Sequence, residues 1–210
     1  MSLPAMDPTL HLTLRAALAL LFVWAASHKL RDVTGFQMAL ANYDLLPPRW
    51  IGPSSILLIG AELGVAVGLW LPRLGAAAAF AAAGLLALYA EAIVINLVRG
   101  RPDIDCGCAG PARRQAISAG LVLRNVALVG AALASALPTA VRSLTWIDGV
   151  TIVAAVATVA LLYGAVDGLL ANAPQIVTLR RRGDAGASGI SSPHLTSPGG
   201  RGTYGEGAHA

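Results

Sequence analysis

The chain has 210 residues, of which 56% are hydrophobic and only 12% are charged, and its mean hydropathy is +0.66. Soluble domains carry about a quarter charged residues, so this composition excludes an ordinary soluble globular protein. The net charge is +4, but the basic residues stand beside apolar segments, where they act as topology signals, so the charge does not indicate nucleic-acid binding.

Five apolar segments approach the ~20 residues that are needed to cross the hydrocarbon core of a bilayer. They predict transmembrane helices over residues 10–30, 51–71, 74–98, 116–137 and 147–171. Prolines stand at or near the ends of several segments, as at Pro47, Pro72 and Pro138. The sequence therefore predicts an all-α integral membrane protein, with a short N-terminal tail over residues 1–9 and a transmembrane domain over residues 10–173.

The first segment also has the features of a secretory signal, because Arg15 precedes an apolar run that ends in small residues. Cleavage there would leave four spans and place the later basic residues outside, against the positive-inside tendency. With five spans and the N-terminus outside, ten basic residues flank the inner ends and two, Arg73 and Arg142, flank the outer ends. The charge distribution therefore predicts a multi-pass protein of the cell inner (cytoplasmic) membrane, with the connector after residue 98 at the cytoplasmic face.

The second predicted span contains a repeated glycine. Gly60, Gly64 and Gly68 form a small-xxx-small strip, which permits close contact between helices in a membrane. We expect this strip to pack against a neighbouring helix.

Polar side chains also lie inside the predicted spans, where they are costly and usually face the bundle interior. The candidates for an intramembrane binding site are Glu62, Glu91, Asn96, Arg124 and Asn125. Glu91 and Arg124 both fall about 12 Å from the inner edge of their spans, which predicts an ion pair between them. Such a pair either only fixes the helix register or takes part in proton transfer, and the sequence leaves both open.

The connector "RGRPDIDCGCAG" contains the two cysteines of the chain, Cys106 and Cys108, on either side of Gly107. A structural zinc site needs four ligands, and few stand nearby, so no metal site is predicted. Two unreactive thiols are an alternative. Glycine permits the tight backbone of a disulfide between residues two apart, and so small a ring would be strained and readily reduced. We therefore interpret the cysteines as a pair for thiol–disulfide exchange.

His28 ends the first predicted span at the same face as this connector. It is a candidate proton donor or acceptor for a thiolate. A histidine that only caps the helix at the membrane interface is the alternative.

Residues 174–210 form the predicted C-terminal tail. It begins with a basic cluster, "RRR" at residues 180–182, and continues with mostly Gly, Ser and Ala. So few apolar residues cannot offset the entropy cost of ordering, which predicts disorder.

Several segments together resemble the methylamine-utilisation protein MauE family, within the wider group of DoxX-like membrane proteins. They are "SHKLRD", "YDLLP", "AELGVAVGLWL", "INLVRGRPDIDCGCAG" and "ISAGLVLRN". The resemblance implies a DoxX-like four-helix transmembrane bundle plus one additional C-terminal transmembrane helix. One departure is Ala109, because the family usually has an aromatic residue after the second cysteine.

The resemblance further implies an accessory role in the maturation of an extracytoplasmic enzyme. In the family this client is the small subunit of periplasmic methylamine dehydrogenase, and a thioredoxin-like protein of the MauD type acts beside it. On this view Cys106 and Cys108 are the redox pair, so the chain is at most a thiol–disulfide oxidoreductase-like factor. No cofactor is firmly implied, and a quinone is the candidate.

A second hypothesis comes from the DoxX-like group. In it the chain is a quinone- or small-molecule-binding membrane bundle, its intramembrane Glu, Arg and Asn residues line the site, and the cysteines are incidental. A purely structural membrane subunit is the third hypothesis, which needs neither set of residues.

Overall fold

The structure, a computed structural model, describes residues 5–104 and 116–189, with side chains described as far as residue 172. The elements in chain order are α1 (Pro8–Arg31), α2 (Val33–Asn42), α3 (Pro48–Gly68), α4 (Gly75–Val98), α5 (Ala119–Ala134) and α6 (Trp146–Gly189). The chain divides into two compact units, Met1–Asn172 and Ala173–Ala210. The first unit contains the helical bundle, and the described part of the second is the continuation of α6.

Within residues 5–104 and 116–189, four helices are long and apolar enough to cross a membrane: Pro8–Arg31, Pro48–Gly68, Gly75–Val98 and Trp146–Asn172. The chain is thus an all-α, multi-pass membrane protein, as the sequence predicts. The fourth predicted span is shorter than expected, because α5 has 16 residues. At ~1.5 Å per residue it is about 24 Å long, which is less than the ~30 Å hydrocarbon core of a typical bilayer.

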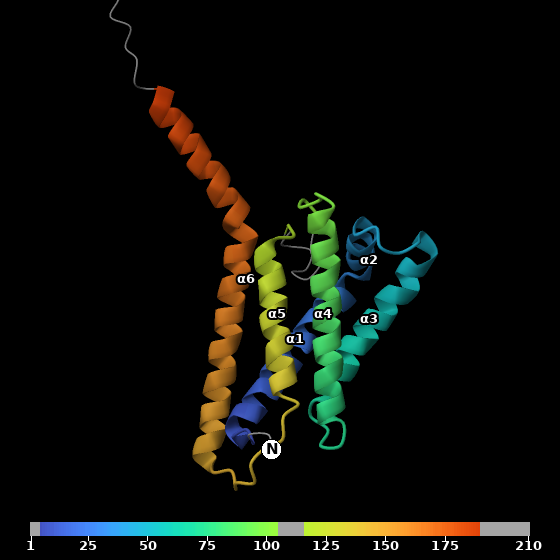
Figure 1. Cartoon of the computed structure of the whole chain (residues 1–210), viewed down its shortest axis with the longest axis vertical. Helices are drawn as coiled ribbons and strands as arrows, with labels where there is room; N and C mark the ends of the chain where they lie inside the picture. The colour runs from blue at the N-terminus through green and yellow to red at the C-terminus, as the bar shows by residue number, and fades with distance from the viewer. Residues whose placement is uncertain (1–4, 105–115, 190–210) are drawn as a thin grey trace, which may run out of the picture. The chain divides into compact units, whose positions relative to one another are not determined.

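Consecutive long helices alternate in direction within the first unit (Figure 1). One end of the bundle therefore collects the C-terminal ends of α1 and α4, the N-terminal ends of α3 and α5, and the short helix α2. We call it the α2 end. The other end, which we call the opposite end, contains the start of α1, the α3–α4 turn and the start of α6.

Helix α2 lies in what the sequence analysis treated as a connector. Asp32 begins it, because the carboxylate accepts a hydrogen bond from the Gly35 N–H at 2.8 Å. Gln37 then donates to the buried Ser55 hydroxyl of α3 at 3.1 Å, so α2 is fastened to α3. Because α2 has only 10 residues, it is too short to appear as a membrane span.

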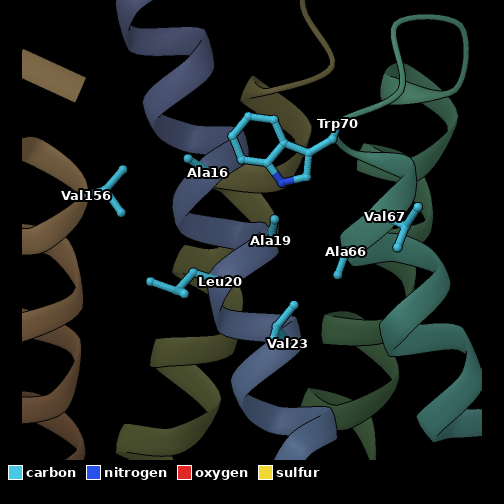
Figure 2. A pocket seen from close by; sticks show the side chains of 8 residues that line it. All are labelled: Ala16, Ala19, Leu20, Val23, Ala66, Val67, Trp70 and Val156. Atoms are coloured by element: carbon cyan, nitrogen blue, oxygen red, sulfur yellow. The ribbon is translucent and has the colours of Figure 1, made fainter. Parts of the chain in front are cut away.

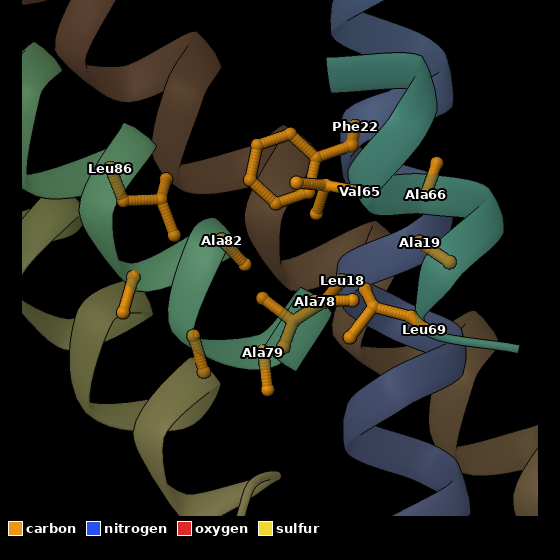
Figure 3. Close-up of a cluster of buried hydrophobic side chains, with 12 residues drawn as sticks. Leu18, Ala19, Phe22, Val65, Ala66, Leu69, Ala78, Ala79, Ala82 and Leu86 are labelled. Carbon is orange, nitrogen blue, oxygen red and sulfur yellow. The ribbon is translucent and has the colours of Figure 1, made fainter. Parts of the chain in front are cut away.

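The core of the bundle is built where α1, α3 and α4 meet (Figure 3). Phe22 of α1 and Leu69 at the end of α3 are nearly inaccessible, and they face a row of alanines on α4. Alanine lets helix backbones approach closely, which supplies packing contacts where lipid gives no hydrophobic driving force. The alanine row consists of Ala78, Ala79, Ala82 and Ala83.

The expectation for the glycine strip of α3 is correct at one position and wrong at two. A Cβ on Gly68 would lie 2.9 Å from the Ala78 Cβ, so α3 and α4 are in close contact there. Gly60 and Gly64 have open space instead of a neighbour. The reason is that α3 diverges from α4 toward the α2 end (Figure 1).

Helix α6 continues over residues 173–189, beyond the predicted fifth span. The disorder predicted for the tail stays a prediction for residues 190–210, which lie outside the described residues.

Candidate functional site

The first polar cluster of the bundle interior is centred on Glu62 of α3. Its carboxylate forms an ion pair with Lys29 of α1, and the exposed fractions of the two side chains are 0% and 4%. The Tyr89 hydroxyl of α4 donates to the same carboxylate oxygen at 2.8 Å. The Lys29 ammonium also lies 5.1 Å from the ring centroids of Phe36 and Tyr89. The cluster therefore joins four helices through one buried charge pair.

Two features explain why this pair is tolerated in an apolar bundle. Lys29 stands in the last turn of α1, where the helix dipole favours a cation. The rings of Phe36 and Tyr89 add cation–π attraction, which strengthens when water is excluded. Glu62 is less completely satisfied, because its second oxygen, Oε2, is buried and accepts no hydrogen bond from the residues that the structure describes.

A second ion pair joins α5 to α6. Arg124 pairs with Asp167, and the guanidinium carbon lies 5.3 Å from the ring centroid of Tyr163. The predicted pair between Glu91 and Arg124 is therefore wrong, and Glu91 is exposed on α4. The depth estimate used only the distance along each helix and said nothing of the direction in which each side chain points.

The two asparagines have separate partners. Asn96 of α4 is fully buried, and its amide donates to the Tyr43 carbonyl at 3.2 Å and to the Ala92 carbonyl at 3.1 Å. Asn125 of α5 donates to the Leu121 carbonyl of its own helix at 3.1 Å. Four of the five intramembrane candidates thus take part in separate local contacts, whereas Glu91 is exposed, and the role of all five in binding a cofactor stays a prediction.

Cys106 and Cys108 lie outside the described residues, but the chain on both sides of them is described. The Ile117 N–H donates to the Ile104 carbonyl at 3.0 Å, so the described chain on the two sides of residues 105–115 meets at one place. That place is the α2 end, where His28 also stands in the last turn of α1. The His28 ring is partly buried and contacts Trp24 edge to face, with centroids 4.7 Å apart.

The opposite end contains a polar cluster that the sequence analysis missed. Arg142, which was counted only as a topology signal, contacts the Asp148 carboxylate at 2.9 Å, the Asp7 carboxylate at 3.3 Å and the Thr9 hydroxyl at 2.8 Å. The hydrogen bond from the Thr9 N–H, together with Arg142, lowers the pKa of Asp7. Bonds to Asp148 and Asp7 raise the pKa of Arg142. This cluster ties the start of α1 to the start of α6.

An apolar groove lies between α1, α3 and α6 (Figure 2). Ala16, Ala19, Leu20 and Val23 of α1 form one side, and the remaining lining residues are Ala66, Val67, Trp70 and Val156. Apart from the Trp70 indole N–H, these side chains offer no hydrogen-bonding group. The groove suits a hydrocarbon chain but gives a polar ring little to bind, since small-molecule sites generally combine apolar walls with a few polar groups.

Known proteins resemble this chain over most of its length. The family model described as "Methylamine utilisation protein MauE" matches residues 7–138, which contain α1 to α5. The "Methylamine utilization protein MauE" of Paracoccus denitrificans is 45% identical over 160 residues, 75% of this chain and 85% of the relative. The protein of the same name from Methylophilus methylotrophus is 37% identical over 163 residues, 77% and 86% of the two chains. The one from Methylorubrum extorquens is 40% identical over 161 residues, 76% and 87%. No solved structure matches the chain.

Proposed function

Because the chain belongs to the MauE family of methylamine utilisation proteins, we propose that its Cys106 and Cys108 carry out thiol–disulfide exchange during the maturation of an extracytoplasmic enzyme. The chain is a multi-pass membrane protein of methylamine utilisation. The proposal adds the cell inner membrane as its location, the small subunit of methylamine dehydrogenase as its client and a thioredoxin-like MauD-type protein as its partner.

One observation carries this proposal. The hydrogen bond between Ile117 and Ile104 gathers both ends of the cysteine-containing connector at the α2 end, beyond the ends of α4 and α5. We propose that a soluble redox domain meets the pair at this end of the bundle. His28 stands at the same end and supports a role in proton exchange with a thiolate.

The exchange is balanced without a further reactant when the partner supplies a disulfide. One thiolate of the pair attacks the partner disulfide and forms a mixed disulfide, and one partner sulfur leaves as a thiolate. The second thiolate of the pair then attacks its neighbour's sulfur and releases the other partner sulfur. Two electrons and two protons pass to the partner, which becomes a dithiol, and this chain keeps the disulfide. The reverse sequence reduces the pair.

Thiol mass-tagging in cells tests the proposal directly, since the chain has only two cysteines and every tag reports on them. We expect the fraction of the pair in the disulfide form to differ from that in wild-type cells when the MauD-type partner is deleted. We also expect a Cys106→Ser/Cys108→Ser variant to lose client maturation. A pair that never changes redox state, in cells where the double variant matures the client normally, would refute the proposal.

The second candidate function is a quinone- or small-molecule-binding bundle. It is favoured by Glu62, whose buried Oε2 has no hydrogen-bond partner in the described part of the chain and could accept a hydrogen bond from a ligand. Glu62→Gln is the informative variant, and Glu91→Gln is its control, because Glu91 is exposed. Loss of client maturation in Glu62→Gln alone, with thiol cycling intact, would favour this candidate over the first.

A further inference from the structure

Glu91 differs from the charged side chains of the bundle interior. The two interior ion pairs give Lys29, Glu62, Arg124 and Asp167 a counter-charge each. Glu91 is exposed on α4, and among the described residues no ion pair or hydrogen bond reaches its carboxyl group. The chain itself therefore leaves this one intramembrane carboxyl group without a contact in its described part.

The position of Glu91 along α4 places it inside the membrane. It precedes Arg99, at the end of the helix, by eight residues, which is about 12 Å along the axis. Each Cα–Cβ bond of a helix is tilted toward the N-terminus, so the side chain points away from this nearer end. Ionisable groups at such depth are costly, and they generally pair with one another or with carbonyl groups. An exposed side chain finds such a pair only on another molecule.

Glu91 belongs to a continuous exposed stripe along α4. The stripe repeats at alternating spacings of four and three residues, which is the pattern of helices that pair in a left-handed coiled coil. It extends along nearly the whole helix, and its members nearest the opposite end are small. We call it the α4 stripe, and it consists of Ala77, Ala81, Gly84, Leu88, Glu91, Ile95 and Val98.

The small residues of the stripe suit close contact with another helix. Alanine and glycine let the backbones of two membrane helices approach each other, which supplies packing contacts in lipid. A Cβ on Gly84 would meet no atom of the described chain within 4 Å, so packing within the chain does not require a glycine there. The stripe therefore combines a surface for close approach with one carboxyl group that lacks a partner.

We propose that a second copy of this chain packs against the α4 stripe, with the two Glu91 carboxyl groups hydrogen-bonded to each other. Copies with the same orientation in the membrane are related by a two-fold axis along the membrane normal, which brings equivalent residues to the same depth. A carboxyl group that carries its proton has one O–H donor and a free acceptor oxygen. Across the axis, the O–H of each Glu91 donates to the carbonyl oxygen of the other. A symmetric pair thus satisfies both groups with no further residue, whereas a different protein would need its own donor at this depth.

Disulfide trapping in cell membranes tests where the copies meet. In the full-length Cys106→Ser/Cys108→Ser background, Leu88→Cys places a thiol on the α4 stripe. Val159→Cys on α6 is the matched control, because Leu88 and Val159 are 49% and 46% exposed and each lies 13 residues after the first residue of its helix. A disulfide requires Cα atoms within about 7 Å of each other. Oxidation with copper phenanthroline should therefore link two copies through Leu88→Cys and not through Val159→Cys.

Förster energy transfer between labelled copies in liposomes measures how strongly the copies associate. The same background carries Ser143→Cys for the donor and acceptor dyes, since Ser143 is exposed at the opposite end. We expect Glu91→Leu to weaken the association about tenfold, because it removes the hydrogen bonds across the interface. Glu91→Gln should retain most of the association, because an amide also donates and accepts.

Gly84→Leu tests the same interface with Glu91 left in place. The new side chain has open space in a single copy, so the chain should fold, but it keeps two copies from approaching closely. Gly164→Leu on α6 is the matched control, because Gly164 is also exposed and a Cβ there would also have open space. We expect energy transfer to fall in Gly84→Leu and to stay unchanged in Gly164→Leu.

This interface does not depend on the thiol chemistry proposed above, and every readout is made without the two native cysteines. Energy transfer no greater than that of random mixing at every protein-to-lipid ratio would overturn the proposal. Equal crosslinking through Leu88→Cys and Val159→Cys would also overturn it, as would crosslinking of Leu88→Cys to a different protein alone. Association of Glu91→Leu and Gly84→Leu as strong as that of the unsubstituted background would have the same consequence. None of these results bears on whether the cysteine pair cycles.

Discussion

At the scale of single residues, Lys29 and Glu62 are buried as a pair. Their contribution to stability depends on the presence of both charges. Removing two charges from water costs several kcal/mol each, and their attraction repays this cost only when both are present. The Tyr89 hydroxyl and the ring of Phe36 complete the surroundings of the pair. Each single neutral substitution therefore leaves a buried charge without its counter-charge.

We expect Lys29→Met to reduce the free energy of unfolding by about 3–5 kcal/mol, because it leaves the Glu62 carboxylate buried and uncompensated. Adding Glu62→Gln should restore most of the loss, since the amide is neutral and its oxygen still accepts from Tyr89. Thermal unfolding in detergent measures both. Glu91→Gln, at an exposed position, should have no effect, and a double variant as unstable as Lys29→Met would contradict the explanation.

The opposite end of the bundle should respond to acid through Asp7. Its pKa lies below the ordinary value of 3.8, so its contact with Arg142 is fully present above that value and is lost as the pH falls through the lower, folded-state pKa. We expect the protection factor of the Thr9 amide, which is corrected for the intrinsic pH dependence of exchange, to fall over that acidic range. Asp7→Asn should make this protection factor insensitive to pH there. Asp103→Asn, an exposed carboxylate at the α2 end, is the control, and its profile should match the wild type.

The sequence predicts which residues are polar and deep, but not what they contact. Glu62 and Asn96 were selected as interior groups, and both are fully buried. Glu91 is predicted on the same grounds and is exposed, while Lys29, one of the ten basic residues counted at the inner ends of the spans, is buried. Rise per residue gives depth from one chain segment alone. The neighbour toward which a side chain points depends on how the helices pack. This packing depends on side chains from distant segments.

At the element scale, α3 shows how one motif serves two environments. Gly68 is enclosed by α4, whereas Gly60 and Gly64 face open space. The repeat in the sequence is the same at all three positions. Only the crossing of α3 and α4 near residue 68 distinguishes them, and the sequence pattern does not contain that crossing.

We expect Gly68→Ala to reduce the free energy of unfolding by about 1–3 kcal/mol, as overpacking does, because its Cβ would lie 2.9 Å from the Ala78 Cβ. Neither atom can move away by rotating a side chain. Gly64→Ala is the matched control and should instead raise stability by about 0.5–1 kcal/mol, since alanine is the better helix former. Thermal unfolding of the two variants checks the prediction, and equal effects would contradict the close contact.

Helix α6 is attached differently from the other long helices. None of the 18-residue window that identifies it as a span is buried, in contrast to a third or more in the other three. Polar contacts hold it near both ends of its span, through Asp148 with Arg142 and through Asp167 with Arg124. In a membrane such contacts position a helix where apolar packing is weak. The apolar groove beside Val156 lies along this loosely packed side.

At the scale of the whole molecule, hydropathy and length predict the long helices well. The first, second, third and fifth predicted spans each correspond to a helix that can cross a membrane. Apolar length predicts neither helix α2 nor the brevity of α5. A local hydrogen bond to Asp32 starts α2, and α5 begins only at Ala119, after the extended backbone of Ser118.

The basic residues at the two ends of the bundle indicate which side of the membrane each end faces. At the α2 end four exposed arginines lie among the described residues, and at the opposite end there are two. Those at the α2 end are Arg31, Arg49, Arg99 and Arg101, and those at the opposite end are Arg73 and Arg142. The positive-inside tendency therefore favours a cytoplasmic α2 end.

We expect a membrane-impermeant thiol reagent to label the cysteines in inverted vesicles and not in spheroplasts, because both flanks of their connector lie at the α2 end. Ser143→Cys in a cysteine-free background is the control, since Ser143 is exposed at the opposite end and should show the reverse pattern. Labelling of the native pair in spheroplasts would reverse the orientation. It would also place the pair on the same side as an extracytoplasmic client, so that exchange would need no carrier across the membrane, whereas a cytoplasmic pair requires one.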